Sequence, residues 1–328
     1  MMKFMKIRAA ALALPLALTA CGGDDGPSSG GGGGTATPAP ATPTPSPTPS
    51  PTATPAPSAG NRAFDAGSNF QGEIYAAEIN VLDVQGTTAG QFEYGSSSAG
   101  VGAPDLDLQY RYTGPSADSM LALFGSEASY RGSEITDRDG DAFAYTATVT
   151  GDIQSDRLTV IPSAEADYVV LLRREVDRAE TANGNPARRT FESYYVTGDP
   201  TALSAIPTGA DREYDMTVVT SSPTRDGAGG FAADGNLTFG FANASFSGAM
   251  VLTQLGASGT AIILEVTVSG RIDRDDGTFQ GTIRSADGAY SGAVVGSFYG
   301  PGAEQIGLVF ALAHDGDPDV VGHGFGVS

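Results

Sequence analysis

The chain has 328 residues, of which 38 are Asp or Glu and 18 are Lys or Arg, so its formal net charge at pH 7 is −20. A surface this acidic repels phosphate backbones and anionic lipid head groups, and we therefore expect no nucleic-acid partner. The single cysteine has no second thiol to pair with, so the folded part must be stabilised by its apolar core rather than by a disulfide.

Residues 1–20 have the three-part pattern of a secretory signal peptide. Three basic side chains without an acid precede an apolar run over 9–20, and this run is too short to cross a bilayer, which takes about twenty helical residues. The segment Leu18-Thr19-Ala20-Cys21 resembles the lipobox of bacterial lipoproteins. The resemblance implies cleavage before Cys21 and acylation of its thiol, so that the membrane is one partner of the chain. The alternative is an ordinary signal peptide that ends near a cysteine.

Residues 21–60 have the composition of a stalk. Gly and Ser dominate up to residue 34, and Pro alternates with Thr, Ala and Ser from 35 to 57. Neither composition can bury a core, and the proline-rich part favours an extended path of about 3.1 Å per residue. In the lipoproteins that the lipobox resembles, an Asp after the cysteine favours the inner membrane. Gly22 and Gly23 stand there instead, which implies the outer membrane, with the domain at the cell surface or facing the periplasm.

Residues 61–205 are predicted to form a β-rich domain, because short alternating segments rich in β-branched and aromatic residues recur along it. We expect strands at Phe70 to Val81, Gly90 to Tyr94, Leu106 to Tyr112, Ala128 to Gly132, Phe143 to Val149, Leu158 to Ile161, Tyr168 to Arg173 and Phe191 to Val196. One short helix is expected from Ala117 to Phe124, with Ser116 as its N-cap.

Residues 206–328 are predicted to form an eight-stranded antiparallel up-and-down β-barrel, because apolar and polar residues alternate with period two. The apolar rows hold large side chains such as Phe246, Met250, Leu264 and Phe310, which predict a filled interior. The expected strands are about 213–221, 236–242, 244–253, 260–271, 277–284, 289–299, 304–313 and 319–328.

Asp-Gly pairs predict the turns between these strands, since glycine adopts positive φ at no steric cost. They are Asp226-Gly227, Asp234-Gly235, Asp276-Gly277 and Asp287-Gly288. Two Asp-rich segments, 137–141 and 273–277, resemble calcium loops but lack the full spacing and the distant Glu, so we interpret both as hairpin turns.

The end of the chain resembles the closing signature of transferrin-binding protein B and related surface lipoproteins. The residues that carry the likeness are Gly296, Phe298, Tyr299, Gly300, Pro301, Ala303, Glu304, Gly307 and Phe310, followed by Gly324, Phe325 and Gly326. A second stretch, from Tyr168 to Tyr214, is similar to that family's passage into its barrel, with Val196-Thr197 as a departure. The resemblance implies one lobe: a β-rich handle domain over 61–205 beside the barrel.

The resemblance further implies a monomeric surface lipoprotein that binds an extracellular protein or a solute, including the iron or haem acquisition found in that family. Two other functions stay open: a structural or adhesive surface protein without a small ligand, and a lipocalin-like carrier with an apolar molecule in its barrel. The sequence does not identify the ligand-binding residues.

Catalysis and cofactors have few candidate residues in this chain. His314 and His323 are its only histidines, and His323 has the parity of Val321 and Phe325, which places it in the barrel wall or interior. His323 could serve as a ligand to haem or a metal, or it could simply be packed in the wall, and we favour the packed histidine. No nucleophile motif, phosphate-binding glycine loop or zinc spacing is found, so we expect no cofactor, no metal and no enzymatic activity.

Overall fold

The computed structural model describes residues 68–71, 75–86, 91–102, 108–112, 120–124, 128–131, 135–139, 142–146, 151–161, 165–221, 232–255, 261–314 and 317–328. Within these residues the protein is all-β, as predicted, apart from the one-turn 3-10 helix η3 (Leu203–Ala205). The predicted signal peptide, Cys21 and the predicted stalk lie outside the described residues.

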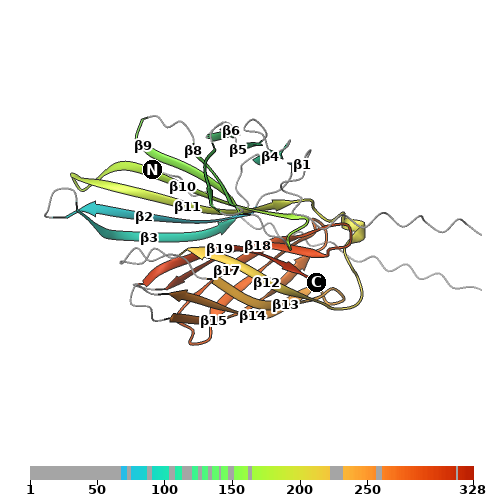
Figure 1. Cartoon of the computed structure of the whole chain (residues 1–328). Coiled ribbons are helices and arrows are strands. Elements are labelled where there is room, and N and C mark those ends of the chain that lie inside the picture. The colour runs from blue at the N-terminus through green and yellow to red at the C-terminus, as the bar shows by residue number, and fades with distance from the viewer. Residues whose placement is uncertain are drawn as a thin grey trace, which may run out of the picture. The chain divides into compact units, whose positions relative to one another are not determined.

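The C-terminal strands close into a barrel in which every strand is antiparallel to its neighbours (Figure 1). Pairing of the first strand with the last closes the cylinder, for example at Thr217 and Phe325. The eight strands are β12 (Arg212–Ser221), β13 (Ala232–Gly240), β14 (Ser245–Leu255), β15 (Ala261–Asp273), β16 (Thr278–Ser285), β17 (Ser291–Tyr299), β18 (Gln305–His314) and β19 (Asp317–Val327). The predicted eight-stranded up-and-down barrel is therefore confirmed.

The barrel interior is filled by side chains, as the alternation predicted. Phe239 lies at the centre of an aromatic cluster, with ring centroids 5.0 Å from Phe246, 4.9 Å from Phe279 and 5.3 Å from Phe298. Aromatic rings at these separations prefer the edge-to-face and offset geometries seen here. Buried Val, Leu, Ile and Met side chains complete the core.

Glycines of β19 make room for this packing. A Cβ on Gly322 would lie 2.9 Å from the Phe310 ring, and one on Gly326 would lie 2.6 Å from the Met216 sulfur. Large and small residues thus alternate across the narrow cylinder, which has an interior just wide enough for side chains.

Two of the predicted Asp-Gly turns are confirmed and one is wrong. Gly277 and Gly288 both have a φ of +76° in the turns that follow β15 and β16. Asp234-Gly235 instead lies inside β13, where Gly235 pairs with both Met216 and Met250. A Cβ at Gly235 would approach Met250, so this glycine serves close strand packing rather than a turn. Asp226-Gly227 lies outside the described residues.

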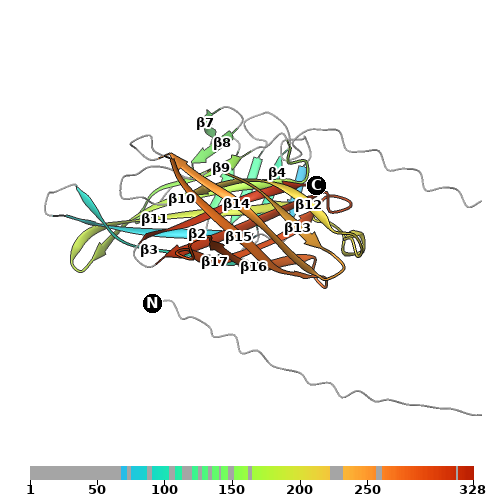
Figure 2. The same cartoon turned by 90° about the horizontal axis from the view of Figure 1, so that it is seen from below.

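The preceding strands form two sheets (Figures 1 and 2). The seven-stranded sheet has the order β3-β2-β11-β10-β9-β8-β7, and the four-stranded sheet has the order β1-β4-β5-β6. The strands are β1 (Ser68–Gln71), β2 (Tyr75–Gln85), β3 (Phe92–Gly102), β4 (Leu108–Tyr112), β5 (Met120–Phe124), β6 (Ala128–Arg131), β7 (Ile135–Asp139), β8 (Ala142–Thr146), β9 (Ile153–Ile161), β10 (Val169–Ala182) and β11 (Asn185–Gly198).

Two expectations for this region are wrong. Met120 to Phe124, predicted to be helical, forms β5 and pairs with both β4 and β6. Its Met, Leu and Ala favour helix, but a helix of two turns is marginal by itself, and sheet pairing on both sides outweighs the propensity. The single strand expected over 70–81 is divided between β1 and β2, which belong to different sheets.

The seven-stranded sheet packs against the outside of the barrel, where β2, β3 and β11 contact β18 and β19. Figure 1 shows β18 and β19 next to β3. A second buried cluster fills this junction. It contains Tyr75, Ala77, Ile79, Tyr168, Val169, Leu171, Tyr194 and Val196 from the sheet side, and Tyr299, Val309, Ala311, Val321 and Phe325 from the barrel. The sheet and the barrel are therefore parts of one compact unit, which spans Ala56–Ser328.

Candidate functional site

The signature turn between β17 and β18 is built by backbone conformations that few residues adopt. Gly300 has a φ of +87°, and Ala303 has a φ of +58° although it carries a Cβ. The turn is stabilised by Glu304, whose Oε2 accepts a hydrogen bond of 2.8 Å from the backbone N–H of Gly302. Pro301 lies exposed at the tip, with φ restricted to a turn value by its ring.

Polar side chains from β12 hold this turn against the barrel. The Tyr214 hydroxyl donates to the carbonyl oxygen of Ala303 at 2.6 Å, and Arg212 donates to the same oxygen and to that of Gly302, both at 2.7 Å. Burial raises the pKa of Tyr214 to about 12, so its hydroxyl stays protonated as a donor at neutral pH.

The turn also connects the barrel to the chain that leaves the seven-stranded sheet. The hydroxyl of Thr201 donates to the Gly300 carbonyl at 2.7 Å, and the Gly300 N–H donates to the Asp199 carbonyl at 2.9 Å. Gln305 is 2 % exposed, and its side-chain amide accepts from the N–H of Tyr168 at 2.8 Å and donates to the Glu165 carbonyl at 2.6 Å.

The remaining signature residues divide between the two faces of the barrel wall. Phe298 and Phe310 point inward, and a Cβ on Gly296 or Gly324 would collide with neighbouring strands or side chains there. Gly326 faces the interior in the same way. Tyr299 and Phe325 belong to the junction cluster, and Gly307 lets Val196 of β11 approach, since a Cβ there would lie 2.4 Å from its Cγ1. The signature residues thus build the barrel and its junction.

His323 lies on the outer side of the barrel wall, fully buried against the seven-stranded sheet. Its Nδ1 is 3.1 Å from the Tyr195 carbonyl oxygen, which requires the proton on Nδ1, and its ring meets Tyr194 edge-on at 4.7 Å. Burial, with Arg173 nearby, lowers the His323 pKa to about 3. The predicted wall position is correct, and the ring is packed among aromatic and aliphatic side chains. Its Nε2 has no hydrogen-bond partner among the described residues.

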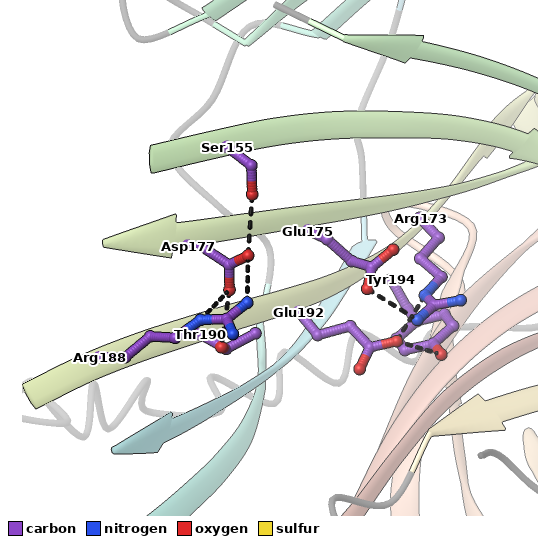
Figure 3. A network of polar contacts seen from close by, with 8 residues as sticks. All are labelled: Ser155, Arg173, Glu175, Asp177, Arg188, Thr190, Glu192 and Tyr194. Carbon is purple, nitrogen blue, oxygen red and sulfur yellow. Dashed lines mark hydrogen bonds and ion pairs between the residues drawn. The ribbon is translucent and has the colours of Figure 1, made fainter. Parts of the chain in front are cut away.

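The outer part of the β10–β11 hairpin carries the candidate binding site, which we call the polar face. It consists of Ser155, Arg173, Glu175, Asp177, Arg188, Thr190, Glu192 and Tyr194 (Figure 3). Cross-strand register places these side chains on one face, because Arg173 pairs with Tyr194, Glu175 with Glu192 and Asp177 with Thr190. The same face carries the junction cluster nearer to the barrel.

Two groups of contacts organise the polar face (Figure 3). In the first, Arg173 forms ion pairs with Glu192 at 2.5 Å and Glu175 at 3.1 Å. In the second, Arg188 donates two hydrogen bonds to Asp177, which also accepts from Thr190 and Ser155, both at 2.8 Å.

The electrostatics of Asp177 follow from this second group. Burial by itself would raise its pKa, but the hydrogen bonds from Arg188, Thr190 and Ser155 outweigh it, so the Asp177 pKa is lowered. Burial raises the pKa of Asp83, an effect that Arg188 partly offsets. The Arg188 side chain is 48 % exposed, and the Arg173 and Glu175 side chains are each 35 % exposed. A ligand can therefore reach charges that a rigid sheet holds in place.

Sequence reasoning missed this site, because the adjacent residues Arg188 and Arg189 do not show by themselves which acids they meet in the sheet. Adjacent residues of a strand point to opposite faces. Arg188 accordingly pairs with Asp177, whereas Arg189 pairs with Glu180 on the other side. It also missed the buried ion pair of Arg174 with Asp156, at 2.9 Å and 3.1 Å. Only the alternation of charges along β10 could have indicated these pairs.

The arrangement is suited to recognition. Among the residues that the structure describes, no group of three or more His, Cys, Asp or Glu is placed to hold a metal ion. Asp273 to Gly277 forms the turn between β15 and β16, as interpreted from the sequence. Asp137 to Asp139 instead belong to β7, where they pair with β8, and residues 140 and 141 lie outside the described residues. Within the same residues, no helix has the length and apolarity to span a bilayer.

Comparisons with known proteins show likeness at the level of the fold alone. No protein-family model and no curated protein matches the sequence. The chain is similar to solved structures of transferrin-binding protein B, with 80 % of this chain covered in each case. The intact protein with N and C lobes gives a TM-score of 0.37 at 13 % identity over 79 % of that chain. A double mutant from Haemophilus parasuis gives a TM-score of 0.35 at 14 % identity over 78 % of that chain. Isotype 1 from Neisseria meningitidis gives a TM-score of 0.31 at 10 % identity over 78 % of that chain. At these values no family is shown, and the fold is established by the strand pairings of this chain.

Proposed function

We propose that this chain is a lipid-anchored protein of the bacterial outer membrane, without enzymatic activity, that binds an extracellular protein or solute through its surface. The lipobox at Leu18 to Cys21 and the stalk support the anchor, and Gly22-Gly23 support the outer membrane. The signature resemblance at 296–310 and 324–326 supports an iron-bearing ligand as the narrower form of the proposal.

The filled barrel is the observation that carries the binding mode. Large aromatic side chains occupy the interior, so a ligand held inside, as in a lipocalin, has no room. Binding therefore falls to the outer surface. There the polar face offers partly exposed Arg and Glu side chains on a sheet that is fixed to the barrel.

The anchor is tested on intact cells that express the full chain. Cys21→Ser should abolish labelling by a palmitate analogue and release the protein, whereas Ser28→Ala in the stalk should leave both unchanged. Protease applied to the cells should remove the folded part from the wild type. Labelling that survives Cys21→Ser would refute lipidation at this thiol, and protection from protease would refute display at the cell surface.

The binding site is tested by cross-linking cells to a mixture of extracellular metalloproteins, with haem as a separate probe. Arg173→Glu together with Arg188→Glu should reduce capture at least about tenfold, since two reversed charges oppose the original ligand. Arg271→Glu, on the exposed face of β15, is the matched control. Equal capture by both variants would reject the polar face, and a change in cell adhesion without any capture would favour the structural or adhesive role.

A further inference from the structure

Strand β3 forms one edge of the seven-stranded sheet, beyond β2 (Figure 1). It is eleven residues long, and in the part of the chain that the structure describes it has a strand partner on one side only. Long edges with open backbone groups are templates for strand addition, and proteins usually protect them with charge, proline or bulges.

The hydrogen-bonding pattern of the sheet identifies the backbone groups that point to the open edge. Asn183 and Gly184 both have positive φ, as a two-residue hairpin turn requires, and such a turn is flanked by a hydrogen-bonded pair. Antiparallel ladders alternate between bonded and non-bonded pairs. The registers between β10 and β11, between β11 and β2, and between β2 and β3 are continuous from this turn to Gly100, so the alternation can be followed from strand to strand. It makes Glu78 of β2 and Gly100 of β3 a hydrogen-bonded pair. The N–H and C=O groups of Ala99 and Val101 therefore point away from β2.

The two edges of this sheet differ in their protection. The opposite edge strand, β7, has five residues, of which Asp137, Arg138 and Asp139 are charged, and its register shifts between Ile135 and Asp137. In β3, the segment from Tyr94 to Gly102 contains no charged residue and no proline, although the register with β2 shifts once, at Leu82/Asp83. One face of β3 packs on β17, β18 and β19 of the barrel, and the side chains of Ala99 and Val101 contact the junction cluster there. Along its edge, and within the residues that the structure describes, this segment of β3 has no further strand partner and lacks the charges that β7 carries.

The residues around β3 indicate what kind of strand fits there. A Cβ at Gly100 or Gly102 would meet no atom within 4 Å, so the solvent side above these residues is open. Glu78, which is exposed, lies directly across from Gly100 on β2. A basic side chain on an added strand can extend over Gly100 toward this carboxylate. A second copy of the chain is disfavoured, because two molecules of net charge −20 repel each other.

We propose that the open edge of β3 binds an extended, basic segment of an extracellular protein as an added β-strand, through the backbone of Ala99 and Val101. Main-chain hydrogen bonds supply the affinity in this mode, and the small side chains of β3 place few demands on the sequence of the segment. The inference rests on the proposed function and identifies the partner as a protein with a basic, extended segment.

The test uses the full mature chain and a short synthetic peptide that alternates threonine and lysine. Binding should slow hydrogen exchange of the Ala99 and Val101 amides at least about tenfold at saturation, and an analogue that alternates threonine and glutamate should bind at least about tenfold more weakly. N-methylation of one alternate set of peptide amides should abolish binding, whereas methylation of the other set, which faces solvent, should not. Ala99→Pro should lose binding, and Thr136→Pro in β7 should retain it.

Four results would overturn the inference. If the peptide binds without slowing exchange at Ala99 and Val101, it is held by charge attraction alone. The same conclusion follows if both N-methylated peptides lose binding equally. Absence of peptide binding would reject the edge as a site. Protection without peptide, together with dimers in analytical ultracentrifugation, would assign the edge to a second copy. The methylated peptides keep the test decisive if Ala99→Pro fails to fold. The capture of extracellular proteins by the polar face is measured on cells, in a separate experiment. A failure of the proposed function can therefore be told apart from a failure of peptide binding at β3.

Discussion

A buried histidine at the junction couples the charge of one side chain to the stability of the fold. His323 donates through Nδ1 to the Tyr195 carbonyl, while its Nε2 lies among apolar and aromatic neighbours. Arg173, which is held by Glu175 and Glu192, is the charged group that acts on it. A second positive charge here would have to be desolvated beside the guanidinium, which is why the ring stays neutral when folded.

Stability should therefore fall on acidification. The pKa of His323 is about 3 when folded and 6.5 when unfolded, so between these values the unfolded chain binds a proton that the folded chain does not. The histidine has no effect on the pH dependence above pH 6.5, and from there to about pH 3 it lowers stability as pH falls. We expect a loss of about 2 kcal/mol between pH 7.5 and pH 5, measured by urea unfolding. His323→Gln should remove most of this loss, and His314→Gln is the matched control. An unchanged slope in His323→Gln would contradict the prediction.

A single glycine sets the approach of the sheet to the barrel. A Cβ on Gly307 would lie 2.4 Å from Val196 Cγ1 and 2.9 Å from the Tyr299 ring. We expect Gly307→Ala to lower the free energy of unfolding by about 1–3 kcal/mol, because the junction has to open to accept the methyl group. Gly209→Ala is the control, since a Cβ there meets nothing within 4 Å. Equal effects of the two substitutions would show that backbone entropy, not packing, dominates at Gly307.

At the scale of elements, β18 is the strand on which both halves of the molecule depend. Its inward row, Ile306 to Leu312, fills the barrel, and its outward row, Gln305 to Ala311, faces the junction, so eight successive residues are buried. Strands buried on both faces lose the apolar–polar alternation that marks a half-exposed strand. Gln305 is the polar exception, and it is satisfied by backbone groups of the sheet side.

Truncation of Gln305 should weaken this docking. Gln305→Ala leaves the N–H of Tyr168 and the carbonyl of Glu165 without their present side-chain partner, and an unsatisfied buried group costs about 1–3 kcal/mol. For these two backbone groups together, urea unfolding should show that the free energy of unfolding falls by about 2–4 kcal/mol. Gln280→Ala, on the exposed face of β16, should change stability by less than about 0.5 kcal/mol. A similar small effect of Gln305→Ala would mean that water replaces the amide.

At the scale of the whole molecule, the junction cluster makes the sheet and the barrel a single cooperative unit. Phe325, Val309 and Val321 are at most 1 % exposed only because the sheet covers them. A barrel without the sheet would present these side chains to water as a contiguous apolar patch, which favours aggregation.

We expect β10 of the sheet and β14 of the barrel to lose amide protection at the same urea concentration, as followed by hydrogen exchange with mass spectrometry. Phe325→Ala removes a buried ring from the junction and should lower stability by about 3–5 kcal/mol, with both transitions shifted together. Leu203→Ala, at a residue that is 52 % exposed, is the control and should shift neither. Separate transitions in the wild type would show that the two parts unfold independently.

Local patterns predicted the barrel well, because its rules act between near neighbours. The alternation that placed Phe246 and Met250 inside depends only on strand geometry, and Gly277 and Gly288 mark turns through their own φ values. The same local reasoning failed at Met120 to Phe124 and at Asp234-Gly235. There the conformation is set by strands that pair from elsewhere in the chain.

The sequence by itself determined the eight-stranded barrel, its filled interior and the turns at Gly277 and Gly288, since periodicity and glycine conformations are properties of the chain. Only the tertiary structure decided which face of the wall His323 occupies, which acid Arg188 meets and which edge of the sheet stays open. The reason is that parity assigns a residue to a face, but long-range pairing decides what covers that face. The polar face and the edge of β3 arise from such pairing between β2, β3, β9, β10 and β11.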